Sequence, residues 1–114
     1  MAEMRIVITA KGDGSSAQFD PTFGRCGFFA LFDSEDGYLE SHENKAAQEP
    51  SGAGKAATRF VGGLGAKAIV TGHLGPNAAM AAKQLGFDVY YGDFGSIQEA
   101  FGRMMSGELG KAQL

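Results

Sequence analysis

The hydrophobic and polar positions of the first 44 residues predict three strands. Residues 4–10 alternate, with apolar side chains at the even positions and Val7 on the other face. Residues 27–33 form a continuous apolar run, which is typical of a buried central strand. The Asp36-Gly37 pair is a strong hairpin signal, so the more polar strand predicted over 38–44 should run antiparallel to 27–33, near an edge of the sheet.

The rest of the chain predicts helices that alternate with strands over 66–71 and 87–91. Apolar residues at helical spacing predict one helix from Ala53 to Leu64 and a second from Pro76 to its stop at Gly86. Ser96 should cap a third, with Glu99 completing a capping box. The faces expected to be buried comprise Ala53, Ala56, Ala57, Phe60, Val61 and Leu64, then Ala78, Ala81, Ala82 and Leu85, then Ile97, Ala100, Phe101, Met104 and Met105. Residues 11–24 and 45–54 are expected to be loops, and the tail after residue 107 is expected to fray.

The predicted order is βββαβαβα, which indicates an α/β protein with a mixed five-stranded sheet and three helices. The length of 114 residues suits a single domain over 1–114. Right-handed crossovers in the last two β-α units, together with the hairpin, give strands one, three, four and five a common direction. Their carboxyl ends then lie at one edge of the sheet, where open α/β sheets bind ligands.

Composition narrows the class of protein. The formal charge is -3 and the pI is about 5.3, which disfavours nonspecific binding of nucleic acid or of a membrane surface. The 44% hydrophobic content is ordinary for a globular domain. The chain has no apolar run of membrane-spanning length, and its start lacks a signal-peptide pattern, so a cytoplasmic protein is expected.

The carboxyl edge of the predicted sheet gathers residues that could hold an anion. Arg25 and Cys26 end a loop near it, and the three helices begin there, near Gly54, Pro76 and Ser96. A helix N-terminus carries unsatisfied N–H groups and about half a positive charge, so several together favour a bound anion. The alternative is that these glycine-rich loops merely make the turns that any α/β sheet needs.

Two side chains could bind metal. Cys26 is the one cysteine, so no internal disulfide can form; a thiolate stabilised by Arg25 would suit a soft metal, whereas a buried thiol would act as a small hydrophobe. His73 lies in a glycine-rich loop before a helix and could ligate a metal or donate to an anion, or have no role. A small hydrolase or transferase using Cys26 with His73 remains a third possibility.

Common nucleotide-binding motifs are incomplete. The Gly-x-Gly-x-x-Ala pattern of residues 12–17 is not followed by a helix-forming segment, and Gly54-Lys55 lacks the other residues of a P-loop. The first strand also lacks the carboxylates of a ribonuclease H-type nuclease.

Several motifs together resemble a known family. They are Phe-Gly-Arg-Cys at 23–26, the hairpin of 33–37, Ser-Gly-Ala-Gly-Lys at 51–55, Thr-Gly-His-Leu-Gly-Pro-Asn-Ala at 71–78, and a closing glycine-rich loop with a short helix. This combination resembles the dinitrogenase iron–molybdenum cofactor biosynthesis (nitrogenase accessory factor-like) family and extends over nearly the whole chain. The resemblance implies a ribonuclease H-like α/β fold.

The resemblance also implies a function. Members bind, carry or shelter metal–sulfur clusters and are not usually enzymes. The implied cargo is an anionic molybdenum–copper sulfide cluster held mostly by noncovalent contacts, or alternatively an iron–molybdenum cofactor precursor or another metal–sulfur cluster. The implied binding residues are Phe23, Gly24, Arg25, Cys26, Thr71, Gly72, His73, Leu74, Gly75, Pro76, Asn77, Gly95 and Ser96, with Cys26 and His73 as candidate metal ligands.

Two positions depart from the family pattern. Many relatives carry glycine in place of His73 and a small residue in place of Cys26, so neither can be a universal ligand of the family.

The implied partners are a ParA/MinD-type ATPase or a cofactor-assembly protein, and a monomer is expected. The alternative function is a cluster-free scaffold or regulatory module for such a partner.

Overall fold

A computed structural model of the chain describes residues 3–114. Its elements are β1 (Arg5–Ala10), β2 (Phe28–Asp33), β3 (Gly37–Glu43), the 3-10 helix η1 (Lys45–Gln48), α1 (Ala53–Gly63), β4 (Ala68–Thr71), α2 (Pro76–Leu85), β5 (Asp88–Tyr91) and α3 (Ile97–Met105). This confirms the βββαβαβα order; η1 lies in a segment that was expected to be loop. Among the described residues, no helix is long and apolar enough to cross a membrane.

The five strands form one mixed sheet in the order β3-β2-β1-β4-β5. β2 is antiparallel to β1 and β3, whereas β4 pairs in parallel with β1 and β5 in parallel with β4. Val7 of the central strand lies opposite Leu31 on one side and Ile69 on the other. Four strands therefore share a direction, as predicted, and β3 lies at an edge of the sheet.

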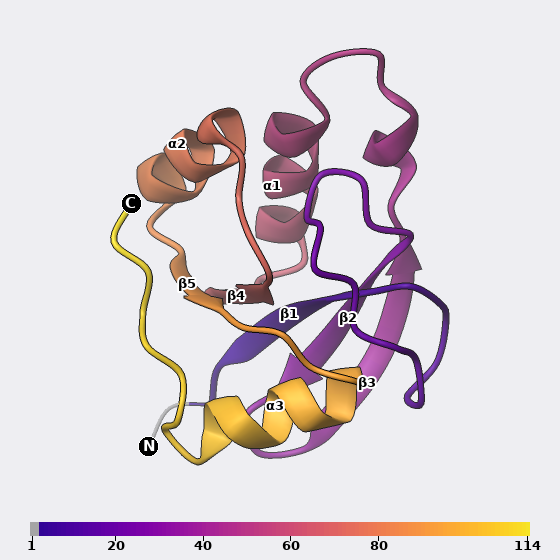
Figure 1. The fold of residues 1–114 in the computed structure, drawn as a ribbon, viewed down its shortest axis with the longest axis vertical. Coiled ribbons are helices and arrows are strands. Elements are labelled where there is room, and N and C mark those ends of the chain that lie inside the picture. Colours follow the sequence, from indigo (N-terminus) through magenta and orange to yellow (C-terminus); the bar gives the residue numbers. More distant parts are fainter. Residues whose placement is uncertain (1–2) are drawn as a thin grey trace.

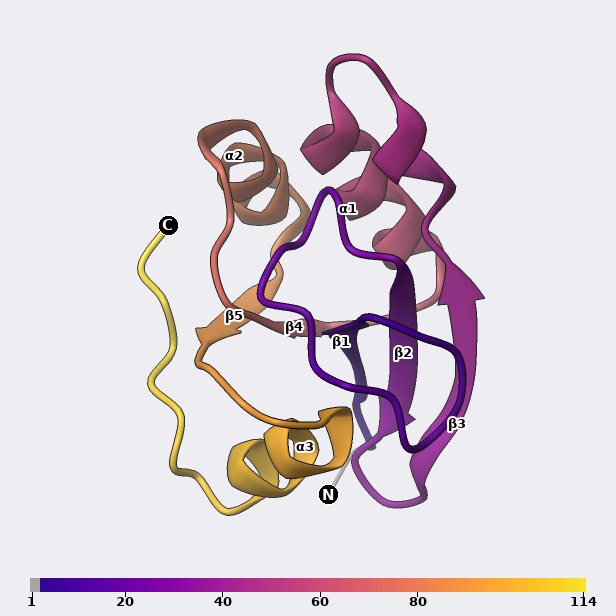
Figure 2. The same cartoon turned by 45° about the vertical axis from the view of Figure 1, so that its right-hand side comes forward.

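Helices cover both faces of this sheet: α1 and α2 lie side by side on one face and α3 lies on the other (Figures 1 and 2). The alternation of side chains along β1 divides the core accordingly. Val7 packs in the cluster under α1 and α2, whereas Ile6 and Ile8 pack in the cluster that includes Ile97 of α3. β1 thus anchors both layers, and its carboxyl end leads directly to the edge where α1 and α2 begin.

The C-terminal tail is ordered along β5, so the prediction that it frays is wrong. Lys111 forms a β-bridge with Tyr90, and the amide of Ala112 donates to the carbonyl of Val89 at 2.7 Å. Leu114 packs against the cluster under α1 and α2. An edge strand presents unpaired backbone groups, and here the tail (the yellow segment of Figure 1) pairs with part of that edge.

Three side chains that were expected to be buried are exposed: Phe60 by 42%, Leu85 by 56% and Met105 by 41%. Each lies at the margin of its helix's apolar stripe. The contact of α1 and α2 with the sheet is made instead by small residues such as Ala57 and Ala82, which are fully buried. Phe60 lies instead over the β2–β3 side of the sheet, with its ring centroid 6.0 Å from that of Phe29 and 5.8 Å from that of His42.

Candidate functional site

A shallow hollow lies at the carboxyl edge of the sheet, between the loop of residues 22–26 and the starts of α1 and α2. Its cavity volume is about 260 Å³. It is lined by Gly24, Arg25, Ala53, Gly54, Gly75, Pro76, Asn77 and Ala78. The structure thus brings five of the predicted binding residues, Gly24, Arg25, Gly75, Pro76 and Asn77, to one place.

Glycine residues allow the three segments that line the hollow to pack closely against one another. A Cβ on Gly24 would lie 3.0 Å from the amide nitrogen of Gly54. A Cβ on Gly54 would lie 3.0 Å from the Cβ of Ala78, which links α1 to α2. Both separations are tighter than ordinary contacts, so glycine at positions 24 and 54 lets the loop and the two helix N-termini meet.

The loop that leads to residue 22 is tied to the ends of β1 and β4. Pro21 accepts a hydrogen bond from the amide of Gly72 at 3.0 Å, and the Thr9 hydroxyl donates to the carbonyl of Asp20. Thr71 is fully buried and its hydroxyl pairs with that of Thr9 at 2.9 Å. A Cβ on Gly72 would lie 2.6 Å from Pro21, so this crossing requires glycine. The predicted residues Thr71 and Gly72 therefore support the loop from beneath.

The N-termini of α1 and α2 are uncapped. Their N-cap residues are Gly52 and Gly75, neither helix has a side-chain cap, and neither has an acidic residue in its first turn. Within residues 3–114, no protein atom accepts a hydrogen bond from the amide groups of Ala53, Gly54, Lys55, Asn77 and Ala78. Such amides, with the partial positive charge of the helix end, attract an anion.

The N-terminus of α3, unlike those of α1 and α2, has both a side-chain cap and an acidic residue in its first turn. The Ser96 hydroxyl accepts from the amide of Glu99 at 3.1 Å, and the Glu99 carboxylate accepts from the amide of Gly95 at 2.9 Å. This confirms the predicted Ser96 cap, whereas the Glu99 carboxylate reaches the amide of Gly95, one residue before the amide that a capping box would use. α3 also lies on the opposite face of the sheet (Figure 2), so the structure does not bring Gly95 and Ser96 into the hollow. Their role in binding stays a prediction.

Arg25 lies exposed at the rim of the hollow. Its Nη1 atom donates to the carbonyl of Glu49 at 2.8 Å and also to that of Ala47, which ties the rim to η1 and its C-cap residue. Nη1 carries two of the five N–H donors of a guanidinium. The other three have no acceptor within the described residues. Arg25 can therefore remain anchored and still donate to a bound anion.

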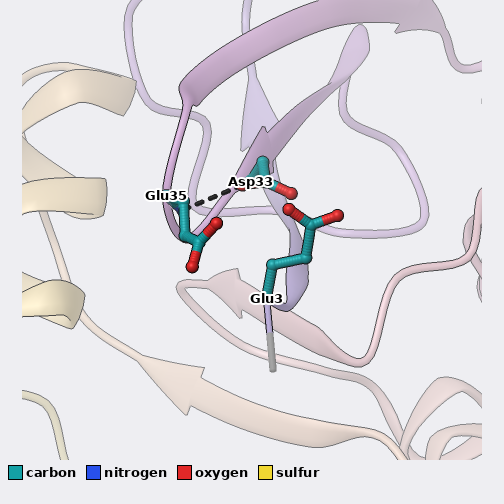
Figure 3. Close-up of side chains that lie close together, drawn as sticks. All are labelled: Glu3, Asp33 and Glu35. Carbon is teal, nitrogen blue, oxygen red and sulfur yellow. Dashed lines mark hydrogen bonds between the residues drawn. The ribbon is translucent and has the colours of Figure 1, made fainter. Parts of the chain in front are cut away.

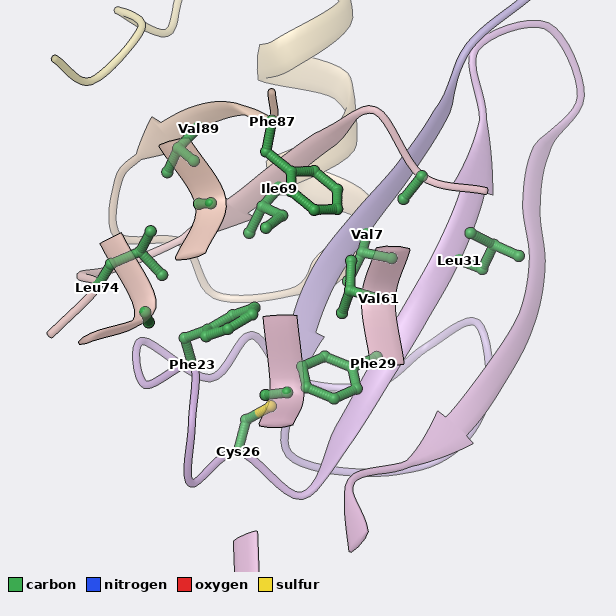
Figure 4. Close-up of a cluster of buried hydrophobic side chains, with 14 residues drawn as sticks. Val7, Phe23, Cys26, Phe29, Leu31, Val61, Ile69, Leu74, Phe87 and Val89 are labelled. Atoms are coloured by element: carbon green, nitrogen blue, oxygen red, sulfur yellow. The ribbon is translucent and has the colours of Figure 1, made fainter. Parts of the chain in front are cut away.

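Cys26 does not face the hollow. It is fully buried, close to Phe23 and Phe29 (Figure 4), and its Sγ donates to the carbonyl of Phe28 at 3.4 Å. Burial raises the pKa of the thiol to about 12, and the negative charge of Asp20 adds to the effect. The thiol is therefore protonated at neutral pH, which favours the core-packing interpretation; ligation by Cys26 stays a prediction.

His73 is exposed at the same edge but outside the hollow. Its ring lies 5.9 Å from that of Tyr91, centroid to centroid. The Tyr91 hydroxyl accepts from the amide of Leu74 at 3.4 Å, so this residue supports the loop. The predicted residues Phe23 and Leu74 are both buried beneath it. No hydrogen bond joins His73 to Cys26 within residues 3–114, and the predicted metal-ligand role of His73 remains untested.

A separate cluster of carboxylates lies at the other end of the sheet. Oxygen atoms of Glu3, Asp33 and Glu35 lie within 4.8 Å of one another (Figure 3). The Asp33 carboxylate accepts from the amides of Glu35 and Asp36, which lowers its pKa. The negative charges nearby raise the pKa of Glu3. Asp33 thus closes the hairpin turn, and the cluster lies far along the strands from the hollow.

Comparison with known proteins places this geometry in a family. The sequence model of the family described as dinitrogenase iron-molybdenum cofactor matches residues 4–107. The chain belongs to this family. A protein of Methanocaldococcus jannaschii is 33% identical over 97 residues, which is 82% of each chain. The family model's match to residues 4–107 includes all three segments that line the hollow, so the hollow lies within the family domain.

Two solved structures extend the comparison to the fold. The apo form of the orange protein from Desulfovibrio gigas superimposes with a TM-score of 0.89 and 28% identity, over 96% of this chain and 92% of the other. An NMR structure of a Thermotoga protein gives a TM-score of 0.83 and 27% identity, over 95% and 92%. The fold of this chain is therefore shared by other proteins along nearly its whole length.

Sequence reasoning left three lining residues out of the predicted binding set: Ala53, Gly54 and Ala78. The signal for them was present in the sequence, since a run of small residues starts α1 without an acidic side chain in its first turn. What the sequence did not show is that this helix start lies against Gly24 and Ala78, because those contacts join segments distant in the chain.

Proposed function

We propose that this chain binds and carries an anionic metal–sulfur cluster as cargo, held mostly by noncovalent contacts in the hollow between the starts of α1 and α2. The protein would shelter the cluster or deliver it, without catalysing a bond-making step. The family supports an association with metal–sulfur cofactors, and the geometry of the hollow supports the binding of an anion there.

The uncapped starts of α1 and α2 carry the proposal. Each contributes a partial charge of about half a unit and several amide donors, and no carboxylate of either helix's first turn competes for them. Arg25 adds a full positive charge with three available donors at the rim. Hydrogen bonds to a charged acceptor are roughly twice as strong as neutral ones, so these donors favour an anion over a neutral guest.

The size of the hollow limits the cargo. A volume of about 260 Å³ falls just below the range of roughly 300–1,000 Å³ that is typical for drug-sized ligands. A compact inorganic cluster suits that space. We propose a molybdenum–copper sulfide cluster, with an iron–molybdenum cofactor precursor or another metal–sulfur cluster as the alternative. His73, exposed at the same edge, offers an imidazole that would suit copper.

Reconstitution tests the proposal. Tetrathiomolybdate and a copper salt are added to the purified protein, which is then separated from free metal by gel filtration. We expect molybdenum and copper to elute with the protein in a fixed ratio, with charge-transfer bands in the visible spectrum. The same mixture with urea-unfolded protein controls for nonspecific capture by the thiol.

A colourless, metal-free protein would contradict cluster binding. It would favour the alternative, a cluster-free scaffold or regulatory module for a ParA/MinD-type ATPase or a cofactor-assembly protein. If only the urea-unfolded protein retained metal, capture would belong to the exposed thiol and not to the fold.

A further inference from the structure

The charges of this acidic chain are unevenly distributed. Residues 50–87 contain no Asp or Glu and four of the ten Lys and Arg residues, a formal charge of +4. The remaining residues hold the other six cations and all thirteen acids, a formal charge of -7. The segment of residues 50–87 includes the whole of α1, β4 and α2. β4 is buried and carries no charge, so the four cations of residues 50–87 lie on α1, on α2 and in the loop between α1 and β4.

Two hollows lie along the seam between α1 and α2, which pack against each other. The first, of about 210 Å³, lies beside Lys55 of α1 and Met80 and Gln84 of α2. The second, of about 300 Å³, lies near the other end of the helices, between Arg59 and Leu85. We call these two hollows together the α1/α2 groove.

The α1/α2 groove combines exposed apolar surface with a cationic rim. Met80 is 62% exposed and Leu85 is 56% exposed, both well above what a buried helix face would show. In the second hollow, Phe87 forms part of the lining and Lys67 joins Arg59 as a second cation. Neither hollow has a carboxylate in its lining. The groove therefore matches a partner that is both acidic and apolar.

We propose that the α1/α2 groove docks an acidic segment of a partner protein, which seats an apolar side chain against Leu85 and Phe87 and places carboxylates beside Lys55 and Arg59. The lysine and arginine side chains of the groove, with no carboxylate among its lining residues, are complementary in charge to such a segment. The second hollow, of about 300 Å³, gives space for an apolar side chain. A Cβ on Gly62 would occupy part of that space, 3.8 Å from both Leu85 Cδ1 and Phe87 Cζ.

A protein segment suits this surface better than a nucleic acid or an anionic membrane. Both of those polyanions present extended negative charge, and the -7 formal charge on the rest of this molecule would repel them at long range. A short acidic segment contacts only the groove. The proposal stands independently of the cargo, although Asn77 lines both the groove and the hollow at the carboxyl edge.

The test is an NMR titration of the isotope-labelled full chain. The probe is a synthetic amphipathic peptide of Glu and Leu, and the comparison peptide replaces every Glu with Lys. Anionic phospholipid vesicles and duplex DNA are titrated separately. We expect the acidic peptide alone to shift amide signals of residues 55–62 and 80–87.

Two pairs of variants locate the binding. Gly62→Ala adds a methyl group inside the second hollow without a clash and should weaken peptide binding about tenfold. Its matched control, Gly102→Ala, makes the same change in α3 on the other face of the sheet, where nothing lies within 4 Å. The double charge reversal of Lys55→Glu with Arg59→Glu should also weaken binding about tenfold, whereas Lys11→Glu with Lys45→Glu, at the same net charge, should not.

The outcomes separate the alternatives. Shifts confined to the groove and weakened by Gly62→Ala but not by Gly102→Ala would support the proposal. No binding of the acidic peptide, shifts elsewhere, or equal binding of the Lys peptide would overturn it. Stronger responses to vesicles or to DNA than to the peptide would overturn it in favour of a membrane or nucleic-acid surface. Because Gly62→Ala should increase helix stability, lost binding cannot be attributed to unfolding.

Discussion

At the scale of single residues, Arg25 has two functions available to it at the rim of the hollow. One nitrogen ties the loop to the carbonyls of Ala47 and Glu49, and three further N–H donors are free for a guest anion. The sequence predicted Arg25 at the binding edge. It did not predict the anchoring contacts, because the acceptors lie in a segment that was expected to be an ordinary loop.

Replacing Arg25 tests the second function. Arg25→Ala should weaken cluster retention by about tenfold, because a hydrogen bond to a charged group contributes about 1.5 kcal/mol or more. The measurement is the fraction of metal that stays with the protein during repeated gel filtration. Arg103→Ala is the control, since Arg103 pairs with Glu99 on α3. Equal retention in wild type and Arg25→Ala would remove Arg25 from the site.

Cys26 yields a prediction about reactivity. With its pKa raised to about 12 by burial, the native thiol should react with iodoacetamide at pH 7 at least about 100-fold more slowly than in urea-unfolded protein. Mass spectrometry follows the labelling. Cys26→Ala should retain the coloured complex. Fast labelling of the folded protein, or loss of colour in Cys26→Ala, would contradict a packing role and favour ligation or catalysis by the thiol.

The ambiguity of Cys26 in the sequence has a physical origin. Its neighbour Arg25 indicated a stabilised thiolate, but the Arg25 guanidinium is hydrogen-bonded to the carbonyls of Ala47 and Glu49, and burial raises the pKa of the thiol. Burial depends on contacts with Phe29 and with Asn44, which also donates hydrogen bonds to the carbonyls of Gly24 and Cys26. These contacts form only once β2 and β3 have paired, and local sequence does not specify them.

At the scale of elements, the three helix N-termini differ in their electrostatics. α3 has Ser96 and Glu99 at its start: the Ser96 hydroxyl accepts from the amide of Glu99, and the Glu99 carboxylate accepts from the amide of Gly95. α1 and α2 begin at glycine N-caps with no acidic residue. The Ser96 cap and the missing acids could be read directly from the sequence. Which helices converge could not, because that depends on which face of the sheet each one covers.

Glycine-to-alanine changes in two helices should have opposite effects. Gly102→Ala lies in α3 with nothing within 4 Å of the added Cβ, so it should raise the free energy of unfolding by about 0.5–1 kcal/mol. Gly54→Ala lies in α1, where its Cβ would meet that of Ala78 at 3.0 Å. It should reduce stability and weaken cluster retention.

Urea denaturation monitored by circular dichroism measures both stabilities, and gel filtration measures retention. A Gly54→Ala variant that gained stability like Gly102→Ala and kept its cluster would show that close contact between the starts of α1 and α2 is not needed.

The apolar stripes predicted the helices correctly but overestimated their buried faces. Phe60 and Leu85 fit the helical period and yet are exposed. Periodicity identifies which side of a helix faces the core, but it does not say how much of each side chain the neighbouring elements cover. Phe60 packs beside Phe29 and His42 on the β2–β3 side of the sheet and still keeps 42% of its surface exposed.

At the scale of the whole molecule, the directions of the strands followed from the sequence through two rules, whereas the order β3-β2-β1-β4-β5 was not predicted. The Asp-Gly hairpin made β2 and β3 antiparallel, and the right-handed crossovers through α1 and α2 gave β3, β4 and β5 a common direction. The C-terminal tail was not predicted, because its residues have no strand-like pattern. Its pairing depends on the open edge of β5, which exists only in the assembled sheet.

Removing the tail tests its contribution to the fold. Deletion of residues 108–114 should lower the free energy of unfolding by about 1–2 kcal/mol, because it removes the Ala112–Val89 hydrogen bond and the half-buried Leu114. Thermal unfolding provides the measurement. Lys111→Ala is the control, since it removes only an exposed ion pair with Asp88 and should cost less than about 0.5 kcal/mol. An unchanged midpoint in the deletion would mean that the tail is frayed in solution.

The proposed function depends on an anionic cluster binding against the uncapped starts of α1 and α2. The most direct test is amide NMR of the isotope-labelled protein before and after loading with tetrathiomolybdate and copper. We expect large shifts at residues 53–55 and 77–78, with the hydrogen-bonded amides of Ile97 and Glu99 unchanged as an internal control. Shifts centred on the start of α3, or on Cys26 without the two helix starts, would contradict it.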